Sequence, residues 1–260
     1  MAVPPLIVAH RGASFDAPEN TLAAFTLGVE QGADAIEGDY FLSGDGQIVC
    51  MHDDTTARTT GGKVSLMIAD APSSELRVLE VGAWKADKFA GERVPLLEEV
   101  LAALPVDTIK YIEIKCGPEI VPELKRVITA SRKPPKHLRV ISFNADVIAE
   151  CKVAMPSIKA YWLTGYERDK KTGNSVPTPD EVIATLKRCR ADGLGTRADM
   201  GVLTSAFVKK LRDSNFEFHA WTVDDPAIAK QLVKLGVDSI TTNKPGWLRE
   251  QLNDVLGKSK

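Results

Sequence analysis

The chain has 260 residues, of which 44% are hydrophobic and 26% are charged, a composition typical of an ordinary globular protein. Its 33 basic and 35 acidic residues give a formal net charge of −2, and no basic run predicts binding to nucleic acid or to an anionic membrane surface. The apolar run at the N-terminus is too short for a signal peptide or a membrane span. The four cysteines lie far apart without a CxxC pair, so we expect reduced thiols and a cytoplasmic location.

Short apolar runs alternate with helical patterns along the whole chain. Between the strands, Thr178 and Glu181 form a capping box at the start of one helix, and Asp225 caps another that ends at Gly236. Eight strands alternating with helices predict parallel βα units, and in this length they favour a closed (β/α)₈ barrel. An open doubly wound sheet is the alternative, but no GxGxxG motif follows the first strand. The candidate strands are residues 6–10, 35–39, 110–115, 138–143, 158–163, 193–196, 216–223 and 238–242.

One long segment interrupts this alternation. The connection between strands 35–39 and 110–115 is far longer than a βα crossover needs. Its turn signal GDGQ predicts an extra strand at 48–52, and a helix at 96–104 resumes the pattern. We therefore expect one barrel domain over residues 1–260 with a small insertion after the second strand, at about 54–93, on the face where barrel enzymes keep their active sites.

Charged residues recur two positions apart near the ends of the second and third strands. Glu37 and Asp39 share one face of their strand, as do Glu113 and Lys115, because residues i and i+2 point to the same side. Converging carboxylates repel one another unless a cation lies between them, and all-oxygen ligation favours Mg²⁺ or Ca²⁺ over zinc. Structural salt bridges to Lys115, Arg11 or Lys110 are the alternative for each acid taken singly. Two pairs of charged residues, each two positions apart at a strand end, favour a bound metal ion over salt bridges.

Two of the four histidines stand at strand ends close to these acids. His10 ends the first strand and His52 ends the extra strand. Imidazole donates or accepts a proton near neutral pH, so the pair predicts an acid/base couple. His219, within the seventh strand, is expected to be a core residue.

Arg11 and Lys115 add positive charge to this set, and an arginine fork suits phosphate oxygens. A hard cation, two proton-transfer groups and two basic side chains suit attack at a phosphodiester, where charge builds on nonbridging oxygens and the leaving alkoxide needs a proton. Two alternatives stay open. A Schiff-base aldolase could use Lys115, and a non-catalytic barrel could bind phosphorylated polyols.

A series of motifs that runs in order over nearly the whole chain resembles the glycerophosphodiester phosphodiesterase family. The motifs are HRGASFDAPENTLAAF, IEGDYFLSGDGQIVCMHDDTTARTT, FAGERVPLLEEVL, YIEIK, AWTVDD and GVDSITTNKP. The resemblance implies a (β/α)₈ barrel with a small insertion after strand two. It also implies metal-dependent hydrolysis of small-molecule glycerophosphodiesters to sn-glycerol 3-phosphate and an alcohol. The implied site consists of His10 and His52 as acid/base pair, Glu37, Asp39 and Glu113 as metal ligands, and Arg11 and Lys115 as phosphate contacts.

Further positions acquire roles through the same resemblance. Glu19 and Asn20 lie in the first βα loop, where they order the loop or meet substrate. Trp221 offers an apolar wall to the glycerol carbons or packs as a strand-end aromatic. Two residues depart from the family pattern. Gly38 stands where a larger residue is common and is expected to loosen the outward packing, and Leu96 replaces a usual Thr or Ser helix cap.

Overall fold

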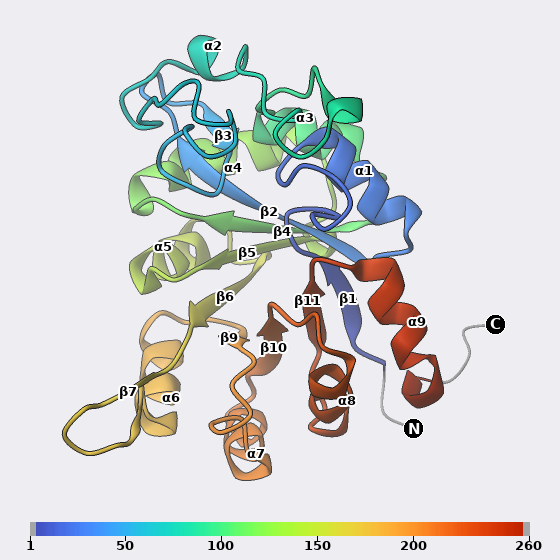
Figure 1. Ribbon diagram of the computed structural model, residues 1–260. Coiled ribbons are helices and arrows are strands. Elements are labelled where there is room, and N and C mark those ends of the chain that lie inside the picture. Colours follow the sequence, from blue (N-terminus) through green and yellow to red (C-terminus); the bar gives the residue numbers. More distant parts are fainter. Residues whose placement is uncertain (1–3, 257–260) are drawn as a thin grey trace.

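The computed structural model of the protein describes residues 4–256 and consists of a closed barrel of eight parallel strands (Figure 1). The strands follow the order β1-β11-β10-β9-β6-β5-β4-β2, and β1 pairs with β2 to close the ring. The predicted (β/α)₈ barrel is therefore confirmed. The strands are β1 (Leu6–Ala9), β2 (Ala35–Leu42), β4 (Ile109–Ile114), β5 (Leu138–Ser142), β6 (Lys159–Thr164), β9 (Gly193–Arg197), β10 (Glu217–Trp221) and β11 (Ser239–Thr242).

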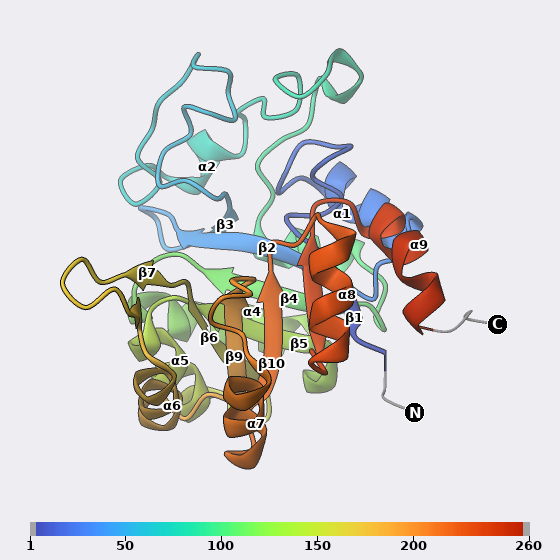
Figure 2. The same ribbon diagram turned by 60° about the horizontal axis from the view of Figure 1, so that its bottom comes forward.

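Helices lie outside the ring of strands, as Figure 2 shows for α5 to α8. The predicted capping box is present, because Thr178 accepts from the backbone N–H of Glu181 and the Glu181 carboxylate accepts from that of Thr178. Asp225 caps α8 as predicted. The helices are α1 (Leu22–Glu30), α3 (Leu97–Ala103), α4 (Val121–Ser131), α5 (Ala145–Ala154), α6 (Pro179–Arg188), α7 (Ser205–Asp213), α8 (Pro226–Lys234) and α9 (Pro245–Leu256). No helix within residues 4–256 is long and apolar enough to cross a lipid bilayer.

Side chains alternate between the two sides of the barrel wall. Ile36, Ile112 and Ile114 point outward into the main hydrophobic core beneath the helices, as predicted. Burying each of these side chains stabilises the fold by about 1.5–3 kcal/mol. The strand positions between them face the lumen. Deep in the lumen the rings of Tyr161 and His219 lie 4.1 Å apart, and His219 Nδ1 is 2.8 Å from Ser239 Oγ. His219 is thus a buried core residue, in line with expectation, held through Nδ1 while its Nε2 has no hydrogen-bond partner among residues 4–256.

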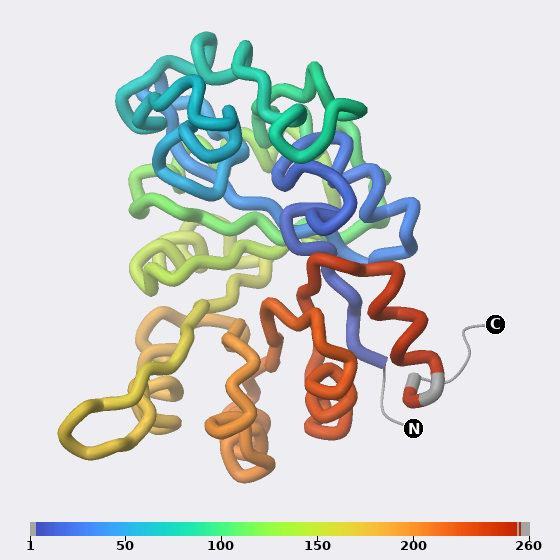
Figure 3. The backbone as a smooth tube through the Cα atoms, in the orientation of Figure 1, coloured from blue at the N-terminus to red at the C-terminus, as the bar shows by residue number. Residues whose placement is uncertain are grey.

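The segment between β2 and α3 forms a compact excursion from the barrel. β3 (Ile48–Cys50) runs antiparallel to the end of β2, which confirms the extra strand and explains why β2 continues beyond residue 39. Beyond β3 the chain is mostly irregular, with α2 (Ser73–Leu76) and a 3₁₀ turn, η1 (Asp87–Phe89), and Figure 3 shows its looping path. It has a small hydrophobic core of its own, made of Val49, Met51, Ile68, Ala71, Leu76, Val81, Val94 and Leu96.

Three smaller features differ from expectation or were not foreseen. A hairpin of β7 (Glu167–Arg168) and β8 (Ser175–Val176) follows β6. Gly38 does not loosen the packing, because a Cβ there would lie 3.0 Å from Phe25 Cζ and 3.1 Å from the Tyr40 hydroxyl. The Phe25 ring occupies the space that a larger residue would take. Leu96 provides no side-chain cap, and instead Glu99 accepts from the Leu96 backbone N–H at 2.8 Å.

Two glycines with left-handed backbone conformations differ in how closely other groups approach them. Gly12 and Gly46 have nearly equal φ angles of +81° and +79°, but only at Gly12 would a Cβ overlap another group, lying 2.4 Å from the carbonyl carbon of Ala24. Gly46→Ala should lower the free energy of unfolding by about 1 kcal/mol, because only the left-handed backbone penalises it. Gly12→Ala should lower the free energy of unfolding by about 3 kcal/mol or more, because its Cβ would also overlap the backbone of Ala24. Urea unfolding of both variants measures the difference, and equal losses would contradict the close approach.

Candidate active site

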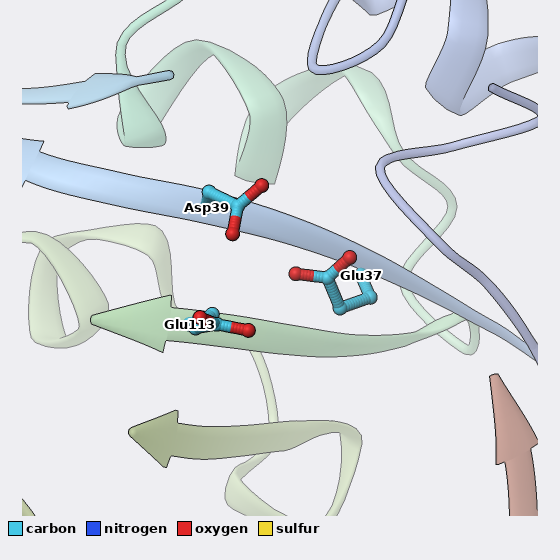
Figure 4. Close-up of side chains that lie close together, drawn as sticks. All are labelled: Glu37, Asp39 and Glu113. Carbon is cyan, nitrogen blue, oxygen red and sulfur yellow. The ribbon is translucent and has the colours of Figure 1, made fainter. Parts of the chain in front are cut away.

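Three carboxylates converge at the C-terminal ends of two neighbouring strands. The parallel register of β2 and β4 sets Asp39 directly beside Glu113, and Glu37 lies two residues earlier on the same face as Asp39. Figure 4 shows the three carboxyl groups turned toward one another. Their exposed fractions are 2% for Glu37, 1% for Asp39 and 8% for Glu113. One oxygen from each lies within 4.8 Å of the others, a spacing that a single cation can bridge.

Two basic side chains flank these acids. Lys115 Nζ lies 2.7 Å from Glu113 Oε1 and 3.3 Å from Asp39 Oδ1, and Arg11 Nε lies 3.2 Å from Asp39 Oδ2. The backbone N–H of Arg11 donates to Glu37 Oε2 at 2.8 Å. The salt bridges considered as an alternative to metal therefore exist, but they leave Glu37 Oε1 buried with no hydrogen-bond partner among residues 4–256. The carboxylate set thus fits a hard divalent cation better than it fits these salt bridges alone.

The electrostatics of the acids point the same way. Burial, reinforced by the Asp39 and Glu113 carboxylates, raises the pKa of Glu37 well above its usual value. Burial, followed by the charge of Asp39, raises the pKa of Glu113 to about 7 despite the contact with Lys115. Ionising both groups without a cation is therefore costly, and a bound divalent ion would offset that cost.

Asn20 and Glu19 order the first βα loop against the acids. Asn20 is 4% exposed, and its side-chain amide donates to Asp39 Oδ2 at 2.9 Å while its carbonyl accepts from the Asp39 backbone N–H at 3.1 Å. Glu19 accepts from Arg11 Nη1 at 3.0 Å and from both Nη atoms of Arg58. Asn20 thus acts on Asp39, and Glu19 acts on Arg11 and Arg58. Contact of either with substrate stays a prediction.

The two histidines are held through Nδ1 by different partners. His10 Nδ1 lies 2.7 Å from Asn243 Oδ1, and His52 Nδ1 lies 2.7 Å from Asp53 Oδ1. Burial, with the Arg11 charge acting in the same direction, lowers the pKa of His10. Hydrogen bonds from Arg58 hold the pKa of Asp53 at about 2, so His52 faces an ionised carboxylate.

One cavity of about 150 Å³ brings most of these groups together. Seven of the ten predicted site residues line it, and the other three, Asp39, Glu19 and Asn20, lie behind them. A larger open hollow of about 900 Å³ beside α9 contains none of the ten, so size alone does not identify the site. The cavity is lined by His10, Arg11, Glu37, His52, Glu113, Lys115 and Trp221, together with Ile141, Phe143, Thr222 and Thr241.

Several residues of the site were not foreseen. Phe143 is 50% exposed and packs edge-on against Trp221 with ring centroids 5.3 Å apart, which extends the apolar wall. Its position at the end of the predicted strand 138–143 is the sequence feature that could have identified it. Arg58, in the insertion, bonds to both Glu19 and Asp53; it lies within the motif that ends in HDDTTARTT, but its position in that motif does not reveal these partners. Asn243 and its contacts depend on a strand register that the sequence does not reveal.

The raised pKa of Glu113 predicts a distinct dependence of stability on pH. Because its pKa rises from 4.5 to about 7 on folding, the folded chain binds more protons in this range, and the stability present at low pH is lost as the pH rises through 7. In the presence of a chelator, wild type should therefore lose stability relative to Glu113→Gln between about pH 5 and about pH 8. Urea unfolding over this range is the measurement. Parallel pH profiles for the two proteins would contradict the assignment.

The chain is similar to known proteins in both sequence and structure. The family model described as the glycerophosphoryl diester phosphodiesterase family matches residues 10–247. A glycerophosphodiester phosphodiesterase from Caldanaerobacter subterraneus subsp. tengcongensis is 32% identical over 260 residues, covering 94% of this chain and 96% of the relative.

Solved structures give the same result. A phosphodiesterase from Oleispira antarctica, in complex with the product sn-glycerol-3-phosphate, superposes with a TM-score of 0.82 at 26% identity, over 96% of this chain and 97% of its own. A glycerophosphodiester phosphodiesterase from Agrobacterium tumefaciens superposes with a TM-score of 0.76 at 26% identity, over 95% of this chain and all of its own. These matches confirm the resemblance of the motifs and the expectation of an enzyme. The chain belongs to the glycerophosphoryl diester phosphodiesterase family.

Proposed function

We propose that this chain hydrolyses glycerophosphodiesters to sn-glycerol 3-phosphate and an alcohol, with a divalent cation at Glu37, Asp39 and Glu113. The observation that carries the proposal is a cluster of three buried carboxylates, two of which, Glu37 and Glu113, line one cavity of about 150 Å³ together with both histidines. The product bound to the related Oleispira antarctica phosphodiesterase supports the choice of substrate class. A cavity of this size suits the glycerophosphate half of the substrate and leaves the alcohol toward solvent.

The cation is Mg²⁺ or Ca²⁺, since the three proposed ligands offer only oxygen. When bound, such an ion would stabilise the negative charge that builds on a nonbridging phosphate oxygen in the transition state. Asn20 holds Asp39 through two hydrogen bonds and thereby keeps one proposed ligand in position.

Arg11 and Lys115 bind the phosphate in this proposal. Both line the cavity, where they contact the carboxylates of Asp39 and Glu113. A cation bound by these carboxylates would leave both basic side chains able to pair with a phosphate oxygen as charge builds on it. Trp221 and Phe143 form the apolar side of the same cavity and suit the glycerol carbons.

His10 and His52 move the protons. In the proposed first step the substrate's glycerol 2-hydroxyl attacks phosphorus, one histidine takes the hydroxyl proton, and the other gives a proton to the leaving alcohol. Water then opens the cyclic phosphate, and the histidines return to their starting states by exchanging roles. Each step conserves protons and releases one product.

The two alternatives fit the site less well. An aldolase needs Lys115 as a neutral amine, but the carboxylates of Asp39 and Glu113 outweigh burial and raise the pKa of Lys115. The lysine is therefore held as an ammonium ion. A barrel that only bound phosphorylated polyols would have no use for two histidines, one held by Asn243 and the other by Asp53.

The prediction of a cytoplasmic location stands as part of this proposal, since all four cysteines are free thiols.

Turnover should require both the substrate class and the cation. Glycerophosphocholine, glycerophosphoethanolamine and glycerophosphoinositol should each release glycerol 3-phosphate, measured by a coupled assay. Exhaustive chelation should abolish release, because repulsion among the three carboxylates is then uncompensated, and Mg²⁺ or Ca²⁺ should restore it. Full activity after chelation and dialysis would rule out the metal mechanism.

Replacing the histidines should separate proton transfer from metal binding. His10→Ala and His52→Ala should each lower the rate by roughly a hundredfold or more while leaving cation affinity nearly unchanged. Glu37→Ala is the matched comparison and should weaken cation binding directly, as measured by calorimetry. The histidine that serves as acid should matter less for a nitrophenyl ester than for a choline ester. Equal loss of the cation in all three variants would refute this division.

A further inference from the structure

His10 is joined to a chain of polar groups that the catalytic proposal does not use. The parallel register of β1 and β11 pairs Ala9 with Thr242, so the next residues, His10 and Asn243, lie side by side at the strand ends. Their contact is the 2.7 Å approach of His10 Nδ1 to Asn243 Oδ1. Behind Asn243, its side-chain amide donates to Asp224 Oδ2 at 2.6 Å.

The orientation of the Asn243 amide is fixed by its neighbours. A carboxylate only accepts hydrogen bonds, so the NH₂ group of Asn243 must face Asp224 and its carbonyl oxygen must face His10. Asp224 is itself held, since Oδ1 accepts from the Asn243 backbone N–H at 2.8 Å and from Thr242 Oγ1 at 2.7 Å. Ser14 Oγ donates to the same Asn243 oxygen at 2.9 Å, which a flipped amide could not accept.

This orientation determines which ring nitrogen of His10 carries a proton. Because Asn243 Oδ1 can only accept, Nδ1 of His10 must be the donor. In the neutral ring the lone pair is then on Nε2, and His10 lines the cavity. The partner of His52 is different in kind, since Asp53 is a carboxylate. An amide partner fixes the tautomer of His10 without placing a negative charge directly on the ring.

We propose that Asn243 and Asp224 are positioning residues that hold His10 in the tautomer with its proton on Nδ1, so that Nε2 is presented to substrate as a proton acceptor. The role in catalysis rests on the proposed function. The tautomer itself does not, because it follows from the hydrogen bonds between His10, Asn243 and Asp224.

The tautomer is tested directly by ¹⁵N NMR of the full chain carrying labelled histidine, at a pH where His10 is neutral. The His10 signals are assigned from their absence in His10→Gln. Wild type should show a protonated Nδ1 and an unprotonated Nε2. Asn243→Ala should show a mixture of tautomers, because the acceptor that selects one of them is gone. The exposed Asn174→Ala, on the β7–β8 hairpin, is the control and should resemble wild type.

Kinetics of the same variants test the consequence. Asn243→Ala should lower kcat by about tenfold or more with little change in KM, since it alters a proton-transfer group and no substrate contact. Asn243→Asp retains an acceptor for Nδ1–H, so it should recover part of the rate. Its carboxylate should also raise the pKa of His10 and move the acidic limb of the pH–rate profile upward. Asp224→Asn should fall between wild type and Asn243→Ala, because its amide can also hold the flipped orientation of Asn243.

The experiments distinguish failure of the tautomer proposal from failure of the proposed function. A single Nδ1-protonated tautomer in folded Asn243→Ala would overturn the proposal, as would an Asn243→Asp profile identical to that of wild type. If the tautomer shifts as expected but wild type hydrolyses no glycerophosphodiester, the hydrogen-bonded chain stands and the proposed function fails. Thermal unfolding of each variant shows whether it is folded, and Asn243→Asp covers the case in which Asn243→Ala is not.

Discussion

Mutual repulsion among Glu37, Asp39 and Glu113 is the constraint around which the active end of this barrel is organised. The three acids are brought together by the β2–β4 register, and they are nearly excluded from water. Arg11, Lys115 and Asn20 each direct a donor or a positive charge at them. Ileucines on the opposite strand faces meanwhile pack beneath the helices. The same backbone thus stabilises the fold on its outer face and concentrates unfavourable charge on its inner one, where a ligand can use it.

The two proposed proton-transfer groups illustrate how one side-chain type is given two environments. His10 is half-buried and backed by a neutral amide, whereas His52 is backed by a carboxylate that Arg58 keeps ionised. Burial lowers the pKa of His10, whereas the ring of His52 lies beside a negative charge. A reaction that needs one base and one acid at the same moment is served by such a difference before any substrate arrives.

Much of the architecture could be predicted because it is encoded locally. Period-two pairs such as Glu37 with Asp39, and caps such as Thr178 with Glu181, depend only on neighbours in sequence. The alternation of strands and helices then leaves few topologies. What could not be predicted depends on contacts between distant segments. Asn243 meets His10 only through the register of β1 with β11, and Arg58 meets Glu19 across an irregular insertion. Gly38 was misjudged for the same reason, because Phe25 fills the space beside it.

Arg58 has a consequence for how such barrels diversify. One guanidinium belonging to the insertion pairs with Glu19 of the first loop and with Asp53 beside His52 at the same time. The insertion is therefore not an exchangeable module, even though it has a hydrophobic core of its own. A chimera that received this segment from a relative would keep its barrel but would leave Asp53 without its arginine and Glu19 with Arg11 alone, unless the donor segment brought a cation to the same place. Recombination at this boundary should succeed only between partners that preserve this bridge.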